Sequence, residues 1–283
     1  VGNYSDGSGG AIYIDRDTSI DTIKGDFLGN EASRYGGAIY TDYSGEIETI
    51  TGDFIGNKAG SGGAIYNRTN VGNLTGDFVG NQANGSGGAI TNFGSMHIKD
   101  SGFYNNISGE SGGAILHEGS LQIENTIFAE NKVLANDSYA AGGAIVYANL
   151  PKAAAVEPAS DEVRYDSITN SVFIRNSVEQ MAVPVSLDDE GIQTYVADPS
   201  EYRGGAIANQ NTIGKIDADF IENRVYASNY SNGYGGAIHN SGRIVDSITG
   251  SFVGNKVEVS QGAYGGAIYN TATLDINDCI LSD

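Results

Sequence analysis

Apolar residues along this chain come in short alternating sets separated by Gly, Asn, Asp and Ser. Residues 36–40 read GGAIY, Ile47 and Ile50 follow, and residues 54–57 read FIGN. Alternation over only a few residues is typical of strands, because successive side chains of a strand point to opposite faces. No longer window carries a persistent helical stripe, so the pattern predicts many short β-strands joined by turns.

Two four-residue motifs alternate along the chain. Gly-Gly-Ala-Ile occurs nine times and Phe-x-x-Asn eight times, and successive Gly-Gly starts lie 27, 26, 25, 25, 30, 62, 31 and 30 residues apart. Such a period is typical of a solenoid, in which each repeat stacks on its neighbours. We therefore predict an all-β fold, a right-handed single-stranded parallel β-helix with about eight complete turns and a partial ninth. It would form a single domain over residues 1–283.

Each motif position has an expected environment in such a coil. The Ile of Gly-Gly-Ala-Ile should point into the core, and the residue after it should face solvent, which would create a tyrosine stripe at Tyr13, Tyr40 and Tyr66. The Phe of the second motif should fill another corner of the core, as at Phe27, Phe54 and Phe78. The Asn that closes this motif should stack as an amide ladder, as at Asn30, Asn57 and Asn81.

The sixth turn is about twice as long as the others. It spans 62 residues, and the excess falls at residues 148–165 and 177–203. Insertions in a solenoid map to loops on one face, which is often the binding face, although a tolerated loop without function is the alternative. The second insertion mixes apolar residues with charged ones, so we place candidate binding residues there: Asp188, Asp189, Glu190 and Tyr195.

The charge of the chain excludes some partners. It carries 35 acidic against 15 basic residues, a net charge of -20, so nucleic acid is not expected as a partner. Its one cysteine, Cys279, leaves no intrachain disulfide, and no apolar run has membrane-spanning length. The chain begins at Val1 with no visible signal peptide, so we expect it to be a segment of a longer protein.

Few titratable residues suggest chemistry. Asp26, Asp53 and Asp77 precede Phe in three consecutive turns, so stacked carboxylates could hold Ca²⁺; the alternative is that they are screened by water. No other cofactor is expected. The three histidines, His97, His117 and His239, occupy unlike positions in different turns, and we expect them at the surface.

The alternation of Gly-Gly-Ala-Ile with Phe-x-x-Asn resembles the repeats of the polymorphic outer membrane proteins first recognised in chlamydiae. That resemblance implies an autotransporter, with a β-helical passenger displayed at the bacterial outer-membrane surface and a translocation barrel elsewhere in the parent chain. It also implies an adhesin that binds a protein or glycan of a host or neighbouring bacterial cell, through the solenoid faces and the long loops.

Two other classes of function remain open. Carbohydrate-active lyases and glycosidases share the β-helix, and they would need convergent carboxylates, or a Ca²⁺ site with a basic residue, in one groove. No such set is evident in the sequence, so an enzyme is not the leading interpretation. A structural scaffold that self-associates end to end into filaments is the third hypothesis, because the open ends of a β-helix expose unpaired strands.

Overall fold

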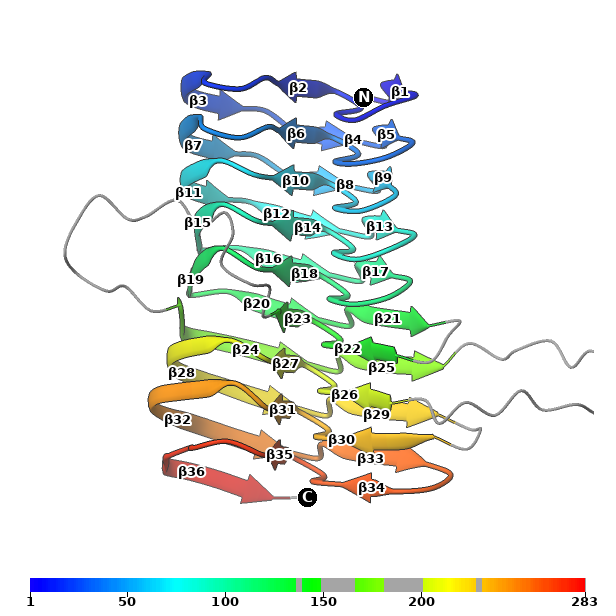
Figure 1. Cartoon of the computed structure of the whole chain (residues 1–283), viewed down its shortest axis with the longest axis vertical. Helices are drawn as coiled ribbons and strands as arrows, with labels where there is room; N and C mark the ends of the chain where they lie inside the picture. The colour runs from blue at the N-terminus through cyan, green and yellow to red at the C-terminus, as the bar shows by residue number, and fades with distance from the viewer. Residues whose placement is uncertain (136–138, 149–165, 181–200, 228–230, 283) are drawn as a thin grey trace, which may run out of the picture.

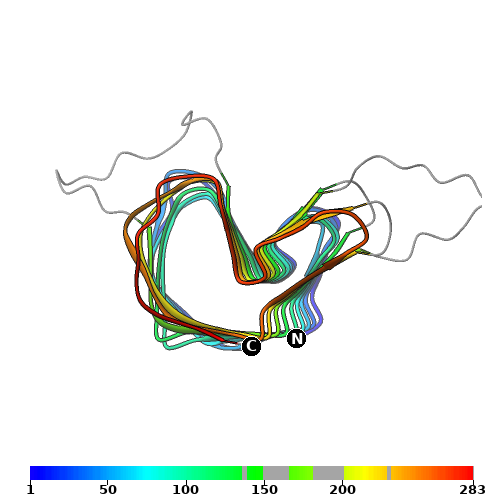
Figure 2. The same cartoon turned by 90° about the horizontal axis from the view of Figure 1, so that it is seen from below.

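The computed structural model describes residues 1–135, 139–148, 166–180, 201–227 and 231–282. Every element in these ranges is a β-strand, and every described strand pair is parallel. The chain winds as a right-handed coil from one end of the molecule to the other (Figures 1 and 2). The predicted parallel β-helix is therefore confirmed, with nine coils stacked in register.

Two sheets of nine strands each run the length of the stack. The Ile sheet, which begins at the Ile of each Gly-Gly-Ala-Ile, contains β2 (Ile12–Ile14), β6 (Ile39–Thr41), β10 (Ile65–Asn67), β14 (Ile90–Asn92), β18 (Ile115–His117), β23 (Ile145–Tyr147), β27 (Ile207–Asn209), β31 (Ile238–Asn240) and β35 (Ile268–Asn270). The arm sheet contains β1 (Tyr4–Ser5), β5 (Glu31–Ala32), β9 (Lys58–Ala59), β13 (Gln82–Ala83), β17 (Ile107–Ser108), β21 (Lys132–Ala135), β25 (Ser177–Gln180), β29 (Arg224–Ala227) and β33 (Lys256–Val259).

A third sheet of 14 strands, the Phe sheet, closes the coil. In the first five coils it consists of two strands per coil: β3 (Ser19–Lys24), β4 (Phe27–Leu28), β7 (Glu46–Thr51), β8 (Phe54–Ile55), β11 (Asn70–Thr75), β12 (Asp77–Val79), β15 (Ser95–Lys99), β16 (Gly102–Tyr104), β19 (Ser120–Glu124) and β20 (Ile127–Ala129). In the last four coils each pair is replaced by one strand: β24 (Asp166–Ile174), β28 (Thr212–Ile221), β32 (Arg243–Val253) and β36 (Ile276–Ser282).

A fourth, short sheet appears only in the second half of the stack. It contains β22 (Tyr139–Ala141), β26 (Glu201–Arg203), β30 (Asn232–Tyr234) and β34 (Ala263–Tyr264). Viewed along the axis, the coil is indented where the chain passes from this side into the Ile sheet (Figure 2). The indentation divides the cross-section into a large lobe between the Ile and Phe sheets and a narrower arm between the arm sheet and the short sheet.

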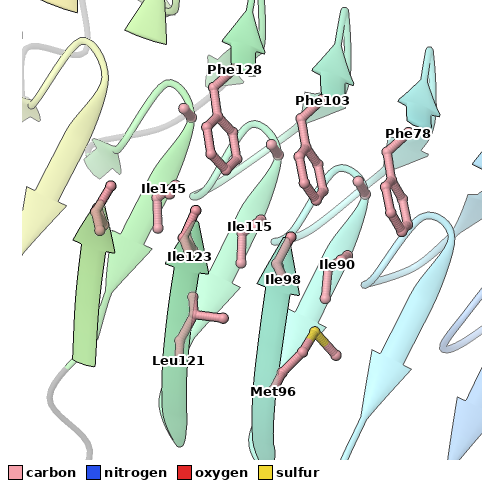
Figure 3. Packing of buried hydrophobic residues seen from close by; sticks show 14 of the residues in the cluster. Phe78, Ile90, Met96, Ile98, Phe103, Ile115, Leu121, Ile123, Phe128 and Ile145 are labelled. Carbon is pink, nitrogen blue, oxygen red and sulfur yellow. The ribbon is translucent and has the colours of Figure 1, made fainter. Parts of the chain in front are cut away.

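Stacked columns of identical side chains fill the large lobe. The Phe rings of successive coils lie 4.6–5.0 Å apart and nearly parallel from Phe27 to Phe252. Figure 3 shows Phe78, Phe103 and Phe128 in one such column, with the Ile columns of the facing strands packed against them. A smaller cluster around Val178 and Tyr202 fills the arm. Burial of these continuous columns drives the folding of each coil onto the next.

An amide ladder stabilises the corner after the Phe column. At each step a backbone N–H and a side-chain Nδ2 donate to the Oδ1 of the next asparagine, and most Nδ2 groups also donate to a Phe carbonyl one coil back. The ladder runs without a break through Asn3, Asn30, Asn57, Asn81, Asn106, Asn131, Asn176, Asn223 and Asn255. Because these groups are mostly buried, the ladder satisfies polar atoms that would otherwise cost stability.

The Gly-Gly pairs are explained by backbone geometry. Gly36 has φ of 61°, a left-handed conformation that glycine adopts without steric cost. At Gly37 a Cβ would lie 2.1 Å from the carbonyl oxygen of Gly63 in the next coil, so any side chain would collide with the backbone there. The Ala that follows is fully buried in the core at Ala38 and Ala64. The backbones of neighbouring coils therefore approach too closely at this turn for any residue but glycine.

Candidate functional site

The tyrosine stripe predicted to face solvent does so only at its first member. Tyr13 is 54% exposed, whereas Tyr40 is 7% and Tyr66 5% exposed. The side chains alternate as predicted, but they point into the indentation of the cross-section and not into open solvent. There Tyr35, from the other side of the indentation, packs 4.6 Å from the Tyr66 ring. The expectation of exposure is therefore wrong for Tyr40 and Tyr66.

These tyrosines belong to a larger group of rings around one guanidinium. We call Tyr35, Tyr40, Tyr43, Tyr66, Phe93 and Arg68 the aromatic–arginine cluster. The Arg68 Cζ atom lies 4.4 Å from the Tyr43 ring centroid, 5.6 Å from that of Tyr66 and 5.7 Å from that of Phe93. At these distances cation–π attraction holds the guanidinium among the rings. At the outer side of the cluster Tyr43 is 39% exposed and Phe93 is half-buried.

The charge of Arg68 is not neutralised by a direct ion pair. The nearby carboxylate, Asp42, is engaged by Arg16, with 3.0 Å between Arg16 Nε and Asp42 Oδ2. Burial opposes ionisation of Asp42, but the hydrogen bonds from Arg16 and the Tyr43 backbone, together with the charges of Arg16 and Arg68, lower the pKa of Asp42. Within the described ranges Arg68 forms no ion pair, and its buried Nε has no hydrogen-bond partner. Burial raises the pKa of Tyr66 to about 12, so Tyr66 offers no negative charge at neutral pH.

A second group of rings lies in the same indentation at the other end of the stack. Tyr234 and Tyr269 lie 4.8 Å apart, and Tyr269 stacks on His239 at 5.4 Å. The arginine here, Arg203, lies over Tyr139 but is ion-paired with Glu201. Thus the two groups share ring chemistry, but Arg203 has a carboxylate partner and Arg68 has none among the described residues. Between them the floor of the indentation is apolar, formed by Leu116, Val146 and Ala208.

Two of the three histidines are buried, contrary to the sequence-based expectation. His239 is 3% exposed, and burial lowers its pKa to about 4, so it is neutral at physiological pH. His117 is fully buried; its Nδ1 accepts from Asn92 and its Nε2 lies 3.2 Å from Asp166 Oδ2. Asp166 Oδ1 also accepts the Leu121 N–H at 2.7 Å. Because every partner is internal, this largely buried pair anchors the start of β24.

The three stacked aspartates use their carboxylates to bind the backbone. The Asp53 N–H donates to Asp26 Oδ1 at 3.1 Å, and the Asp77 N–H donates to Asp53 Oδ1 at 3.0 Å. Burial and the charge of Asp53 raise the pKa of Asp77. Over the part of the chain that the structure describes, no group of three or more His, Cys, Asp or Glu could hold a metal ion. These carboxylates therefore form a hydrogen-bonded column, and the structure adds no support to the Ca²⁺ hypothesis.

The family comparison bears on the two motifs that build every coil. The family model of the Chlamydia polymorphic membrane protein repeat matches residues 25–42 and 52–68. Each match contains one Phe-x-x-Asn and the Gly-Gly-Ala-Ile that follows it. The chain carries polymorphic membrane protein repeats. The predicted resemblance is confirmed, while no curated protein and no solved structure matches the chain.

Polymorphic membrane protein repeats associate the chain with a membrane or cell surface. Among the residues described, no helix has the length and apolar character needed to cross a membrane. The candidate binding residues Asp188, Asp189, Glu190 and Tyr195 lie outside the described residues. Of the second predicted insertion, residues 177–203, both ends are regular strands: β25 pairs with β21, and β26 pairs with β22. Only residues 181–200 are thus additional to the repeat.

One surface of these repeats was missed by sequence reasoning. A cavity of about 800 Å³ lies beside the arm sheet in coils four to eight. Charged residues of both signs line it: Glu130, Glu179, Glu222, Glu258, Lys132, Arg175, Arg224 and Lys256. Equivalent positions of successive coils, such as Lys132, Ser177, Arg224 and Lys256, are 32–47 residues apart in sequence. They meet because each coil places the same position above the last, so the repeat spacing was the signal that could have found them.

Glu179 is central to this charged cavity. Its carboxylate lies 3.1 Å from Lys132 Nζ and 3.0 Å from Arg224 Nη2, and it accepts the Ser177 hydroxyl at 3.0 Å. Burial opposes ionisation, but the hydrogen bonds from Lys132 and Arg224 outweigh it and lower the pKa of Glu179. Glu179 therefore links three successive coils.

Proposed function

We propose that this chain is the binding segment of a surface-displayed bacterial adhesin. Its ligand would be a protein or glycan on a host cell or a neighbouring bacterial cell. The observation that carries the proposal is the aromatic–arginine cluster, which gathers partly exposed rings and an unpaired guanidinium on one side of an acidic rod. Aromatic and arginine side chains dominate the energetics of recognition surfaces, because they bury large areas and make directional contacts.

The architecture supports the same function. A solenoid is a stiff rod whose repeats contact only their neighbours, so it can hold a recognition surface away from the membrane. We further propose that residues 149–165 and 181–200 contribute to ligand contact, and that the parent chain carries a translocation barrel and is displayed outside the outer membrane. End-to-end self-association through strand pairing stays a prediction that sedimentation of the purified chain at increasing concentration would test.

Bead attachment tests the proposed function. Beads coated with the purified chain should attach to cultured epithelial cells or to bacterial cells well above beads coated with an unrelated acidic protein. Soluble chain should compete in a saturable manner. A version in which residues 149–165 and 181–200 are replaced by short connections should keep its β-sheet signal, and its remaining attachment would show how much binding the solenoid face supplies. Attachment equal to that of the unrelated protein would exclude an adhesin for these cells.

A carbohydrate-active enzyme is the second candidate, and the charged cavity is the observation that favours it. Four glutamates and four basic residues in one cavity are the kind of set that acid–base cleavage of a glycan needs. Three of these residues are engaged together in the ion pairs around Glu179, which favours a structural role. Release of reducing sugar from polysaccharides, abolished by Glu222→Gln, would establish the enzyme; no release would leave the cavity as an ion-pair network.

A further inference from the structure

We propose that the aromatic–arginine cluster binds a carboxylated sugar unit, a hexose ring that bears an acid group. The inference rests on the proposed function and names the ligand class of that site. The Arg68 guanidinium would pair with the carboxylate, and the exposed sides of Tyr43 and Phe93 would contact the apolar face of the sugar ring.

The Arg68 guanidinium has no carboxylate partner among the described residues. Its guanidinium carries five N–H donors in a planar fork, and the buried Nε–H has no hydrogen-bond partner. No carboxylate of the described residues pairs with it, because Asp42 is engaged by Arg16. Within the described residues Arg34 and Arg243 also lack an ion pair, but Arg68 is the one that lies among several aromatic rings. A carboxylate fits such a fork better than any neutral group.

Two of the rings around the guanidinium are partly exposed. Tyr43 is 39% exposed and Phe93 half-buried, so both present part of their surface to solvent beside Arg68. A sugar ring has an apolar face of C–H groups and a rim of hydroxyls, which matches a tyrosine ring and its hydroxyl. Ligand sites in general combine aromatic walls with a few polar groups that fix orientation. The cluster has that composition.

The aromatic–arginine cluster does not suit an extended peptide, a nucleic acid or an amphipathic helix. An extended peptide cannot add a strand here, because β6, β10 and β14 are each paired on both sides within the Ile sheet. A nucleic acid needs clustered Lys and Arg side chains for its successive phosphates, and the cluster holds a single arginine. An amphipathic helix needs an aliphatic groove, and the cluster is built of tyrosines, a phenylalanine and an arginine.

The second group of rings supplies an internal control. Arg203 lies 5.3 Å from the Tyr139 ring, much as Arg68 lies over Tyr43, but Arg203 is ion-paired with Glu201. Its charge is already compensated, so it should not attract a carboxylate. Arg203→Gln is therefore the matched variant for Arg68→Gln.

Calorimetric titration of the whole chain with trigalacturonate tests the proposal. Its methyl ester, which keeps the rings and loses the charges, is the matched neutral probe, and triglutamate is the acidic peptide probe. We expect trigalacturonate to bind at least tenfold more tightly than either. Arg68→Gln should abolish that preference, Arg68→Lys should weaken it several-fold because the bidentate fork is lost, and Arg203→Gln should leave it unchanged. Sialyllactose against lactose repeats the comparison with a second acidic sugar.

Several results would overturn the proposal. One is that neither acidic sugar binds at millimolar concentration. Another is that the ester or triglutamate binds as tightly as trigalacturonate. A third is that Arg203→Gln lowers the affinity for trigalacturonate as much as Arg68→Gln does. Circular dichroism and thermal melting of each variant distinguish loss of binding from loss of fold. If Arg68→Gln misfolds, Arg68→Lys, which keeps the cation between the rings, serves as the test variant. If the coated beads attach to cells but the chain binds no acidic sugar, the carboxylated sugar is not the ligand and the proposed adhesin function still stands.

Discussion

At the scale of the residue, one asparagine per coil makes several bonds at once. Asn106 donates from its amide to the Phe78 carbonyl and to Asn131 Oδ1, both at 2.9 Å. Its own Oδ1 accepts the backbone N–H and the amide of Asn81, both at 3.0 Å. Buried groups of this kind have no water to replace a lost partner, so each asparagine secures the coils on both sides of it.

The first prediction concerns this ladder. Asn106→Ala should destabilise the protein by about 3 kcal/mol or more, because it leaves several buried donors and acceptors without partners. Asn125→Gly is the control: Asn125 is exposed, has φ of 50° and bonds only to exposed side chains. This substitution should lower the free energy of unfolding by about 1 kcal/mol or less. Urea denaturation of both variants decides; equal midpoints would show that the ladder adds nothing to stability.

The second prediction concerns the Phe column. Phe78 is fully buried between Phe54 and Phe103, with ring centroids 4.6 Å away on both sides. Phe78→Ala should therefore cost about 3–5 kcal/mol by opening a cavity. Tyr13→Ala, at a ring that is 54% exposed, should cost about 1 kcal/mol or less. Tyr66→Ala should lie between the two, since Tyr66 is buried in the indentation and not in the core. Thermal melts give the order.

The third prediction is a pH dependence. Glu179 has a pKa below its ordinary value of 4.5, so its ion pairs stabilise the folded state above that pH and are lost as the pH falls through the lowered pKa. Glu179→Gln should lower the melting temperature by a few degrees at pH 7. The difference from the parent protein should shrink toward pH 3. A difference that is the same at both pH values would mean that packing, and not charge, is what Glu179 contributes.

The Phe and Asn columns could be read from the sequence, because each copy of a motif meets an identical copy in the next coil. The burial of Tyr40 and Tyr66 could not, because it depends on Tyr35 and Arg68, which lie outside the motifs on either side of the indentation. The partner of His117, Asp166, lies 49 residues away, beyond an insertion. Repetition thus makes contacts between like residues predictable, and contacts between unlike residues need the shape of the coil.

At the scale of the element, the turn into the Ile sheet sets how closely coils can approach. The second glycine of each pair faces a backbone carbonyl of the next coil; at Gly63 a Cβ would lie 2.0 Å from the Gly88 oxygen. The left-handed corner after the Phe column is different. A Cβ at Gly56 would meet nothing within 4 Å, and later coils place Asn105 and Glu130 in the left-handed conformation at that corner. Glycine is therefore required at the turn into the Ile sheet and optional at the corner after the Phe column.

The fourth prediction follows from that contrast. Gly63→Ala should prevent native stacking or destabilise the protein by more than about 3 kcal/mol, because backbone must move to accommodate the methyl group. Gly56→Asn should change stability by about 0.5 kcal/mol or less, because asparagine tolerates a positive φ. Expression and denaturation of the two variants give the answer. Tolerance of Gly63→Ala would contradict the close approach of neighbouring coils.

At the scale of the whole molecule, the chain is a rod whose stability is spread along stacked coils and whose proposed recognition groups lie on one side. The fold was predictable from spacing alone, since 17 motif copies in alternation leave few other ways to bury the apolar positions. Of the aromatic–arginine cluster, only Tyr40 and Tyr66 were among the predicted residues. The arginine, the flanking rings and the charged cavity come together through the stacking of coils, which no single repeat reveals.

A binding isotherm of the labelled chain on intact cells tests directly whether the aromatic–arginine cluster binds the ligand. Three proteins are compared: the parent chain, the double variant Tyr43→Ser with Phe93→Ser, and Tyr226→Ser, which removes an equally exposed tyrosine, 41% against 39%, from the arm sheet. We expect saturable binding by the parent chain. The affinity of the double variant should fall by about tenfold or more, and Tyr226→Ser should keep the affinity of the parent chain. Equal binding by the double variant and the parent chain, with both folded, would contradict that expectation.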